Sequence, residues 1–458
     1  MKISRFFLLT LIVTFIPFMS YAFDFKEGGL CYNLNEDGKT VTMTYEHLIL
    51  FAYDAPAPKE KGYIGYIVIP KEVKHDGKTY KVTAIDEGTF MMNTELKRVS
   101  IPSTVKTIGK DAFNHCNSLE LVNLPPNLTE ISDYAFAQCG LQTINIPDKV
   151  KTIGQSAFND CYLKSISLPN SVKKIGKSAF SACRWLKDVK LGNSVESIGE
   201  AAFSVCTDLK SITLPASLKE IGAWAFYECI SLEKATIPAS VSDIGAGAFK
   251  SCHKLTSLEV ENGNKRYDSR GGCNAIIETA TGTLVAACNG STIPESVIKI
   301  AAEAFYGCYG LTAINIPASV TEIGDQAFFY CKNLRELNIP NSVTTIGERA
   351  FCGCDSLENV VISNSVKSIG YAAFLHDESI KTVTIGSGVT SISSWAFKGL
   401  DAVKSITSEI EDVSNVKMGK DVFDEIDKSK CTLYVPRGTA TLYKAAPQWS
   451  DFKNISEQ

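Results

Sequence analysis

The sequence is poor in the residues and motifs that mark a catalytic or metal-binding site. Its 458 residues include only five histidines, which are far apart in the chain: His47, His75, His115, His253 and His376. No G-x-S-x-G, H-E-x-x-H or phosphate-loop segment is present. We therefore predict that the protein is not an enzyme and that it carries neither a cofactor nor a metal.

An excess of charge of one sign is also lacking. Lys and Arg number 46 and Asp and Glu number 50, which gives a net charge of −4, and no long block of like charges occurs. A nucleic-acid-binding surface needs clustered basic residues, and so does a polybasic membrane-binding segment. The composition therefore disfavours both partners.

Long apolar runs are scarce, and the one that stands out, Phe6–Phe18, lies at the start of the chain. Lys2 and Arg5 precede it, and Ser20-Tyr21-Ala22 supplies small residues for cleavage. This order is typical of a secretory signal peptide over residues 1–22, and the run is short for an uncleaved membrane anchor. We predict export to the cell surface, the periplasm or the medium, with no membrane span after cleavage near Ala22.

The chain is built mainly from one repeated motif. The motif is V-x-x-I-G-x-x-A-F-x-x-C-x-x-L-x-x-I-x-I-P, and it is clearest at Val320–Pro340. A chain of 458 residues exceeds the usual size of a single core, so its length predicts either several domains or a repeat array, and the repeat favours the array. The phenylalanine recurs every 22 or 23 residues, apart from one wider gap, at Phe90, Phe113, Phe136, Phe158, Phe180, Phe203, Phe226, Phe249, Phe305, Phe328, Phe351, Phe374 and Phe397.

Each part of the repeat has a structural reason. In L-x-x-I-x-I-P the two isoleucines alternate inward along a strand, and proline ends it. V-x-x-I-G is a second extended segment, and A-F-x-x-C predicts a single helical or 3₁₀ turn. One repeat cannot bury its own apolar face, but stacked repeats bury a continuous column. The expected fold is mainly β, a right-handed solenoid of about 13 coils.

The repeat also sets the expected organisation of the chain. A β cap over residues 23–80 precedes a first array over 81–260, an insert occupies 261–293, a second array covers 294–410 and a C-terminal cap covers 411–458. In the last segment we expect a strand at Thr432–Pro436 and a short helix at Thr439–Ala446, with Leu442, Trp449 and Phe452 closing the core.

The insert is expected to contain a β-hairpin. Its strands are Asn274–Glu278 and Thr283–Ala287, and pairing Glu278 with Thr283 would set Cys273 opposite Cys288. Directly opposed residues come close enough for a disulfide. A Cys273–Cys288 disulfide is one reading, and two free thiols are the favoured one.

The repeat resembles the BspA-like, or treponemal-type, leucine-rich repeat over roughly Val82 to Phe397. The flanking segments Gly77–Val82 and Leu433–Pro436 match the caps of that family, and Tyr267-Asp268-Ser269 matches a variant repeat. The resemblance implies a leucine-rich-repeat solenoid with N-terminal and C-terminal caps. It further implies an exported bacterial surface protein, some relatives being adhesins, with no catalytic residues to carry over.

In ten of the thirteen coils a cysteine follows the repeat phenylalanine by three residues, and Asn93, Asp377 and Leu400 take this place in the others. The ten cysteines are Cys116, Cys139, Cys161, Cys183, Cys206, Cys229, Cys252, Cys308, Cys331 and Cys354. Metal sites need a few convergent ligands with mixed spacings. An even ladder instead indicates a small buried side chain that fills one place in each coil.

Two sets of exposed residues remain as candidate binding surfaces. A modest basic stripe would arise where lysines stack on neighbouring coils: Lys164, Lys187, Lys190 and Lys210. An aromatic edge would arise beside the bends, suited to protein or sugar contacts if its side chains are exposed: Tyr134, Trp185, Trp224, Tyr227, Tyr306, Tyr309, Tyr330 and Trp395. Exposed strand lysines are also common protection against edge-to-edge pairing, and the aromatics could instead widen the core.

The sequence therefore predicts a non-catalytic solenoid that binds an unidentified protein or glycan at a cell surface. Adhesion to host matrix proteins, other cells or glycans is the favoured function. The alternative is a structural or scaffolding envelope protein that has no specific ligand.

Overall fold

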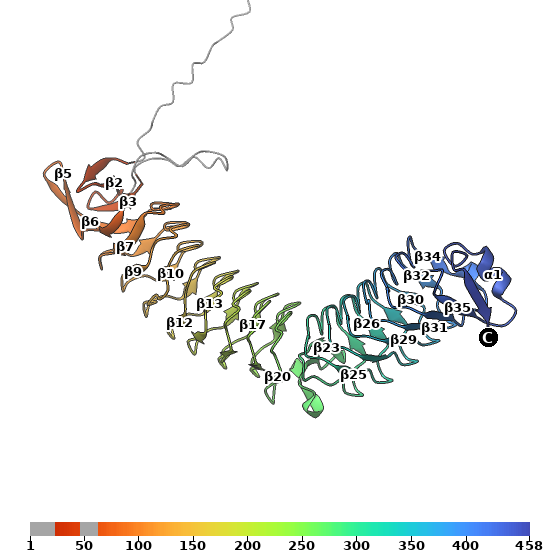
Figure 1. Ribbon diagram of the computed structural model, residues 1–458. Helices are drawn as coiled ribbons and strands as arrows, with labels where there is room; N and C mark the ends of the chain where they lie inside the picture. Colours follow the sequence, from red (N-terminus) through yellow and green to blue (C-terminus); the bar gives the residue numbers. More distant parts are fainter. Residues whose placement is uncertain (1–22, 46–62) are drawn as a thin grey trace, which may run out of the picture.

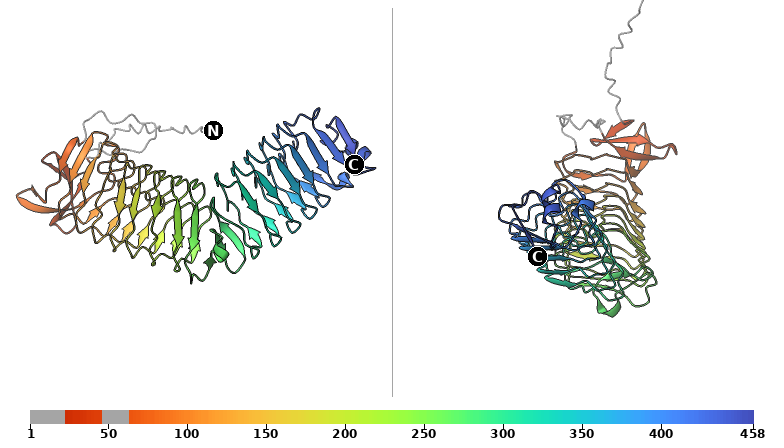
Figure 2. Two further views of the ribbon diagram at one scale, coloured as in Figure 1. Left: turned by 60° about the horizontal axis from the view of Figure 1, so that its bottom comes forward. Right: turned by 90° about the vertical axis from the view of Figure 1, so that its right-hand side faces the viewer.

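The structure is a computed structural model that describes residues 23–45 and 63–458. Its coils stack into two arms that meet at an angle at the insert (Figures 1 and 2). The predicted signal peptide and residues 46–62 of the predicted N-terminal cap lie outside the described residues.

Two parallel sheets run along the first arm because most of its coils add one strand to each of them. One sheet consists of β10 (Glu130–Ile131), β11 (Thr152–Ile153), β13 (Lys174–Ile175), β15 (Ser197–Ile198), β17 (Glu220–Ile221) and β19 (Asp243–Ile244). The other consists of β12 (Ser165–Ser167), β14 (Asp188–Lys190), β16 (Ser211–Ile212), β18 (Lys234–Ile237) and β20 (Ser257–Val260). Equivalent residues pair, as Ile131 does with Ile153, so one isoleucine lies over the next in the core.

The second arm repeats this arrangement. One sheet continues from the insert through β24 (Lys299–Ile300), β26 (Glu322–Ile323), β28 (Thr345–Ile346), β30 (Ser368–Ile369), β32 (Ser391–Ile392) and β34 (Lys417–Met418). The other contains β25 (Ala313–Asn315), β27 (Glu336–Asn338), β29 (Asn359–Ile362), β31 (Thr382–Ile385), β33 (Ser405–Ser408), β35 (Thr432–Val435) and β36 (Asn454–Glu457).

The bend around each repeat phenylalanine is not the helical turn that the sequence predicts. The residues two before and two after the phenylalanine have positive φ, as Ser178 (53°) and Ala182 (60°) do around Phe180. Left-handed residues at this spacing interrupt any helix. The bend is therefore a chain of tight turns that places the phenylalanine rings in a stack, with Phe203 and Phe226 5.7 Å apart and inclined by 2°.

Caps close both ends. The N-terminal sheet contains β1 (Phe25–Glu27), β2 (Leu30–Leu34), β3 (Thr40–Thr44), β5 (Glu72–His75), β6 (Lys78–Ile85) and β8 (Thr107–Ile108). Strand β4 (Gly65–Val68) falls within the range predicted as cap, yet it pairs in parallel with β7 (Leu96–Ser100), which in turn pairs with β9 (Leu121–Asn123). Cap and array therefore form one continuous stack.

At the C-terminal end, helix α1 (Ala440–Ala445) packs against β36, which pairs with β35, and against the 3₁₀ turn η2 (Val413–Asn415). Trp449 is fully buried and its ring lies 4.8 Å from that of Phe423, the last ring in the phenylalanine stack. The prediction that Leu442 helps to close the core is wrong: Leu442 is 44% exposed, and the adjacent Tyr443 is buried because its hydroxyl reaches Ser408 and the Ile410 carbonyl.

The insert forms β21 (Tyr267–Asp268), the 3₁₀ turn η1 (Arg270–Gly272), β22 (Ile276–Glu278) and β23 (Thr283–Ala286). Strands β22 and β23 make the hairpin, with Glu278 paired to Thr283, and β23 then pairs in parallel with β24. The hairpin thus replaces a coil at the start of the second arm.

The hairpin also divides the apolar core into two clusters. Ile276 belongs to the cluster of the first arm, and its neighbour Ile277 belongs to the cluster of the second. Since successive residues of a strand face opposite sides, one strand can serve as a wall for both cores.

Candidate binding site at the junction of the two arms

The cysteine column is structural. Nine of its thiols donate to the carbonyl of the repeat phenylalanine in the preceding coil, at 3.0–3.4 Å from Sγ to oxygen. Burial raises the pKa of Cys116 to about 12. A buried, protonated thiol is a poor nucleophile and a poor metal ligand. The tenth, Cys308, reaches the Ala287 carbonyl of the insert instead, at 3.9 Å.

Within residues 23–45 and 63–458, no group of three or more His, Cys, Asp or Glu side chains is placed to hold a metal ion. Over the same residues, no helix has both the length and the apolar character that a membrane crossing requires.

Cys273 and Cys288 are both buried free thiols in the structure. A bulge between Ile276 and Ile277 shifts the hairpin register by one residue, so that the Cys288 thiol faces the Asn274 carbonyl at 3.4 Å. The two sulfurs also belong to different cores, Cys273 to the second arm and Cys288 to the first. The offset removes the alignment on which a disulfide would depend.

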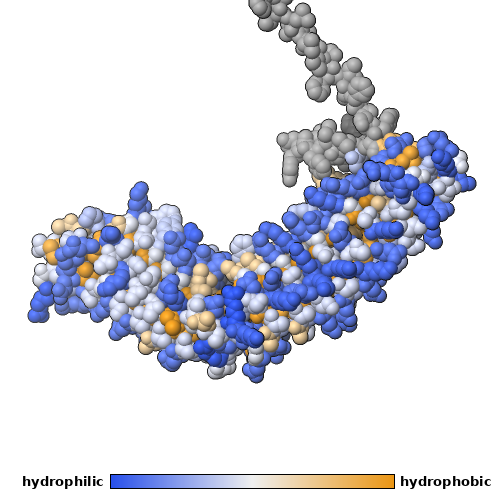
Figure 3. All heavy atoms as spheres, turned by 180° about the vertical axis from the view of Figure 1, so that it is seen from behind, coloured by the Kyte–Doolittle hydropathy of each residue, from blue (hydrophilic) through white to orange (hydrophobic). Residues whose placement is uncertain are grey.

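The four lysines of the predicted basic stripe are all exposed on the first arm. Lys164 and Lys187 are neighbours, since the Lys187 amide donates to the Lys164 carbonyl. However, the Lys187 ammonium lies 3.9 Å from the Asp208 carboxylate, and Glu233 follows Lys210 in the next coil. Carboxylates therefore interrupt the stripe. Figure 3 shows rows of hydrophilic side chains on the rear face of this arm and more apolar atoms near the junction with the second arm.

The predicted aromatic edge divides into separate groups. Trp185 (43% exposed) pairs with Tyr162, and Trp395 pairs with Tyr371 in the second arm. Tyr134 is partly buried, and its hydroxyl accepts from the Gln155 amide at 2.7 Å. The remaining five lie around the junction of the two arms: Trp224, Tyr227, Tyr306, Tyr309 and Tyr330.

The largest of these groups, which we call the junction cluster, comprises Tyr306, Tyr309, Phe329 and Tyr330. The Tyr306 ring stacks on Phe329 at 4.8 Å and meets Tyr330 edge-on at 6.4 Å. The Lys332 ammonium lies 5.4 Å from the centre of the Tyr309 ring and 5.5 Å from that of Tyr330, and so links them. Tyr330 is 40% exposed, so the cluster offers aromatic surface with a cation beside it.

An ion pair joins the cluster to the first arm. Lys250 Nζ lies 2.5 Å from Glu303 Oε1 and 3.8 Å from the centre of the Tyr306 ring, and both charged side chains are largely buried. Burial is the main cause that raises the pKa of Tyr306 to about 12, with smaller contributions from Tyr330 and Glu303. The interaction with the Glu228 carboxylate, followed by burial, raises the pKa of Tyr227. These tyrosines therefore keep their hydroxyl protons at neutral pH.

Two glycines make room for the aromatic rings. A Cβ on Gly247 would stand 2.7 Å from Cδ1 of Trp224, and one on Gly353 would stand 2.3 Å from the Tyr330 ring. Each glycine lies one coil after the ring that it admits, at the bend position where φ is positive (62° and 76°). This pairing of an aromatic residue with a glycine 23 residues later is a signal that the sequence carries.

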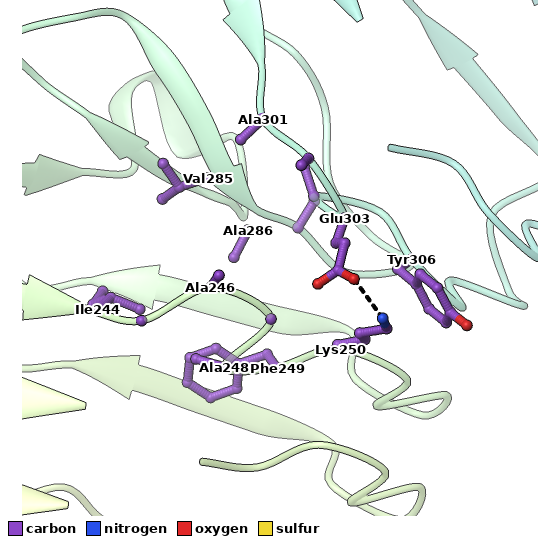
Figure 4. A pocket seen from close by; sticks show the side chains of 15 residues that line it. Ile244, Ala246, Ala248, Phe249, Lys250, Val285, Ala286, Ala301, Glu303 and Tyr306 are labelled. Atoms are coloured by element: carbon purple, nitrogen blue, oxygen red, sulfur yellow. Dashed lines mark hydrogen bonds and ion pairs between the residues drawn. The ribbon is translucent and has the colours of Figure 1, made fainter. Parts of the chain in front are cut away.

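Behind the cluster lies a pocket of about 280 Å³ between the last coil of the first arm and the insert. Ala246, Ala248 and Phe249 form one wall, Val285, Ala286 and Ala301 form the other, and the Lys250–Glu303 pair lies beside Tyr306 at one side (Figure 4). Most of its lining is small and apolar, so the pocket accepts a slender neutral group.

The repeat pattern identifies the chain. A family model of the BspA-type leucine-rich repeat region matches residues 83–195, 173–271 and 286–425, in six copies. The chain belongs to the BspA-type leucine-rich repeat family. The predicted resemblance is confirmed, and so is a mainly β solenoid with very little helix.

Solved structures show the same architecture. A leucine-rich cell surface protein from Faecalibacterium prausnitzii is 29% identical, with a TM-score of 0.64 over 84% of this chain and 94% of that one. A leucine-rich repeat protein from Bacteroides ovatus is 27% identical, with a TM-score of 0.60 over the same shares. The pneumococcal vaccine antigen PcpA is 21% identical, has a TM-score of 0.56 over 95% of this chain and 98% of that one, and shows the fold alone. No curated protein matches the sequence.

Sequence reasoning missed part of the BspA-type junction. Lys250, Glu303 and Lys332 were not predicted as site residues because each occupies an outward position in its own repeat. Their meeting depends on which coils the insert brings together. The interrupted period between Phe249 and Phe305 marks where such contacts form, although it does not identify them.

Proposed function

We propose that this BspA-type protein is exported and acts as a non-catalytic binding protein that recognises a protein partner at a cell surface through the junction cluster. The observation that carries the proposal is the group of stacked rings at Tyr306, Phe329 and Tyr330, flanked by lysine side chains at the meeting point of the arms. Membership of the family and the similarity to a leucine-rich cell surface protein support it.

The physical argument rests on what aromatic rings contribute to recognition. Tyr and Trp bury large areas at low cost in conformational entropy and dominate the affinity of protein interfaces. A lysine over a ring adds a further attractive term. By contrast, the interrupted basic stripe consists of lysines and offers no such anchor. The stripe therefore ranks below the junction cluster as a site for an anionic partner.

The experiment compares two double variants of the exported protein. Tyr306→Ala with Tyr330→Ala removes the junction cluster, whereas Tyr162→Ala with Trp185→Ala removes the separate aromatic pair of the first arm. Binding is measured to immobilised matrix proteins, whole bacterial cells and a glycan array. We expect the junction variant to lose roughly tenfold or more in affinity for a protein target and the control to bind normally.

Other outcomes would change the conclusion. Binding to glycans alone would replace the protein partner by a sugar. Normal binding by the junction variant would exclude the cluster. If no target bound, and deletion of the protein weakened the envelope, the scaffolding role would replace adhesion. N-terminal sequencing of the mature protein tests export, with Phe23 as the expected first residue.

A further inference from the structure

In the regular stack, a bend donates three main-chain hydrogen bonds to the next coil, except the bend of Phe351, which donates two among the described residues. The donors are the repeat phenylalanine and the residues two before and two after it. In one coil Trp224, Phe226 and Glu228 donate to the carbonyls of Ala246, Ala248 and Lys250, at 3.1, 2.8 and 3.0 Å. The acceptors are therefore main-chain carbonyls on alternate residues of the neighbouring coil.

The last bend of the first arm breaks this rule. Ser251 still donates to the Tyr306 carbonyl at 3.2 Å. The amides of Gly247 and Phe249, however, donate to no acceptor within the described residues. Phe249 is the one repeat phenylalanine of the thirteen, from Phe90 to Phe397, whose amide lacks an acceptor in the described part of the chain.

Elsewhere at this junction, the insert satisfies the donors that the missing coil leaves open. The Tyr267 hydroxyl accepts from the Ile244 amide on β19 at 3.2 Å. Asn274 Oδ1 accepts from Leu258 at 2.7 Å, and Ser269 Oγ accepts from Val260 at 3.0 Å, both on β20. The two open amides are therefore specific to the bend, where Gly247 and Phe249 line the pocket.

The opposite wall of the pocket carries a complementary group. By analogy with Ala246 and Ala248, the carbonyls of Ala302 and Ala304 should receive the two amides. The Ala304 carbonyl instead accepts from Ala287 at 2.9 Å, while the Ala302 carbonyl has no donor among the described residues. Phe249 is buried and Gly247 is partly buried, whereas Ala302 is exposed. Buried main-chain donors almost always find a partner, so the two amides carry the argument and the Ala302 carbonyl adds to it. The pocket thus presents two donors on one side and an acceptor on the other.

We propose that this pocket binds a short extended peptide segment that lies parallel to the coils and takes the place of the missing bend. Two of its carbonyls accept from Gly247 and Phe249, and one of its amides donates to the Ala302 carbonyl. This proposal deepens the proposed function and rests on it, because it places the main chain of a protein partner beside the junction cluster. Strand addition of this kind draws affinity from main-chain bonds and specificity from side-chain space.

The dimensions and charge of the site define the segment. A pocket of about 280 Å³ lies near the lower end of the usual range for ligand sites and is lined mainly by Ala, Gly and Val. Small side chains such as Gly, Ala or Ser therefore fit, and bulky ones do not. Lys250 and Glu303 neutralise each other beside the pocket, so the segment is uncharged and its binding depends little on salt.

The test measures amide exchange in the intact mature protein. Without ligand, hydrogen–deuterium exchange at Gly247 and Phe249 should exceed that at Trp224 and Phe226, their counterparts one coil earlier. An acetylated and amidated pentapeptide of alternating glycine and alanine, at millimolar concentration, should slow exchange at Gly247 and Phe249 roughly tenfold. The same peptide with its amides N-methylated should have no effect, because it cannot donate to Ala302.

A matched pair of variants tests the site. Ala246→Leu fills the pocket and should abolish the protection, whereas Ala223→Leu, at the same position one coil earlier, should leave it unchanged. Slow exchange at Gly247 and Phe249 without ligand would show that the arms close the gap themselves, and would overturn the proposal. Equal protection by the N-methylated peptide, or none by either peptide, would also overturn it. Loss of target binding in the Tyr306 and Tyr330 variant reports on the proposed function separately.

Discussion

A regular coil of the first arm and the coil at the junction have almost the same sequence pattern, yet they are held in different ways. Around Phe226 the ring stacks on both sides, at 5.7 and 5.3 Å, and three bend amides bind the next coil. Around Phe249 the ring stacks on one side only within the described residues, and one bend amide binds onward. The repeat residues therefore determine the shape of a coil, whereas the neighbouring coils determine how many stacking contacts and hydrogen bonds it makes.

The two regions also differ in what they expose. In regular coils nearly all bend amides bind the next coil, so these bends offer mainly side chains to a partner. At the junction, main-chain donors, an aromatic cluster and a partly buried ion pair occur together. In this protein, the groups that we propose for binding are therefore concentrated where the repeat is interrupted.

The largest effect should distinguish the two phenylalanines. Phe226→Ala leaves a cavity between two rings and should lower the free energy of unfolding of the first arm by about 3–5 kcal/mol. Phe249→Ala should cost less, because one side of its ring already borders the pocket. Urea denaturation followed by circular dichroism measures both. Equal losses would show that the junction is packed as tightly as the stack.

A second test concerns the coil in which Asp377 replaces the cysteine of the column. Asp377 is fully buried, Oδ1 accepts from the Cys354 amide at 2.7 Å, and Oδ2 has no partner within the described residues. Burial raises the pKa of Asp377 well above its usual range. Asp377→Cys should restore the regular column and stabilise the second arm at neutral pH by about 1–3 kcal/mol.

The pH dependence of that gain follows from the sign of the shift. Because the folded pKa of Asp377 is raised, the folded state keeps a proton that the unfolded chain loses above about pH 4. The wild-type protein therefore loses stability as pH rises from there toward the folded pKa. The advantage of Asp377→Cys should be largest at neutral pH and shrink toward pH 4. Thermal denaturation across this range checks it, and a gain independent of pH would contradict the assignment.

A smaller effect should show that the hairpin serves both cores. Ile276→Val and Ile277→Val each remove one methylene and should cost about 0.5–1.5 kcal/mol. Ile276→Val should destabilise the first arm and Ile277→Val the second, since the two side chains belong to different clusters. Exchange rates in each arm report the difference. A loss spread evenly over both arms would indicate a single cooperative core.

The smallest effect concerns the ion pair of the junction. Glu303→Gln leaves the partly buried Lys250 without its carboxylate, whereas Glu200→Gln breaks the exposed pair with Lys177 in a regular coil. We expect Glu303→Gln to cost about 1 kcal/mol and Glu200→Gln close to zero. Chemical denaturation in low and high salt measures both. Equal costs would show that the junction pair is as solvated as the surface pair.

The sequence allowed the solenoid to be predicted because each inward residue recurs in phase. Phe, Ile and Cys occupy equivalent places in successive coils, so the fold expected for one repeat applies to the others. The bend geometry was missed because residues as different as Ser178, Trp224 and Gln326 adopt the same positive φ there. Main-chain hydrogen bonds to the next coil hold these residues in the positive-φ conformation. Such bonds do not depend on the side chain, so residue types do not reveal them.

The junction could be predicted only in part. The sequence allowed us to predict the wider interval after Phe249 and the hairpin, including the pairing of Glu278 with Thr283. The bulge at Ile276 was not, because a one-residue shift depends on how two cores are packed at once. The open amides of Gly247 and Phe249 could not be foreseen either, since they result from a neighbour that is absent rather than from a residue that is present.

The single onward bond of the Ser251 amide has a mechanical consequence. A surface protein whose ends are held by different bodies is loaded as a beam, and a beam yields where its cross-section has the fewest bonds. At the junction one bend amide is bound onward where other bends have two or three, while the insert adds its own hydrogen bonds elsewhere in the same section. We therefore expect load to open the bend side of the junction first, and this opening would widen the site where we place the partner.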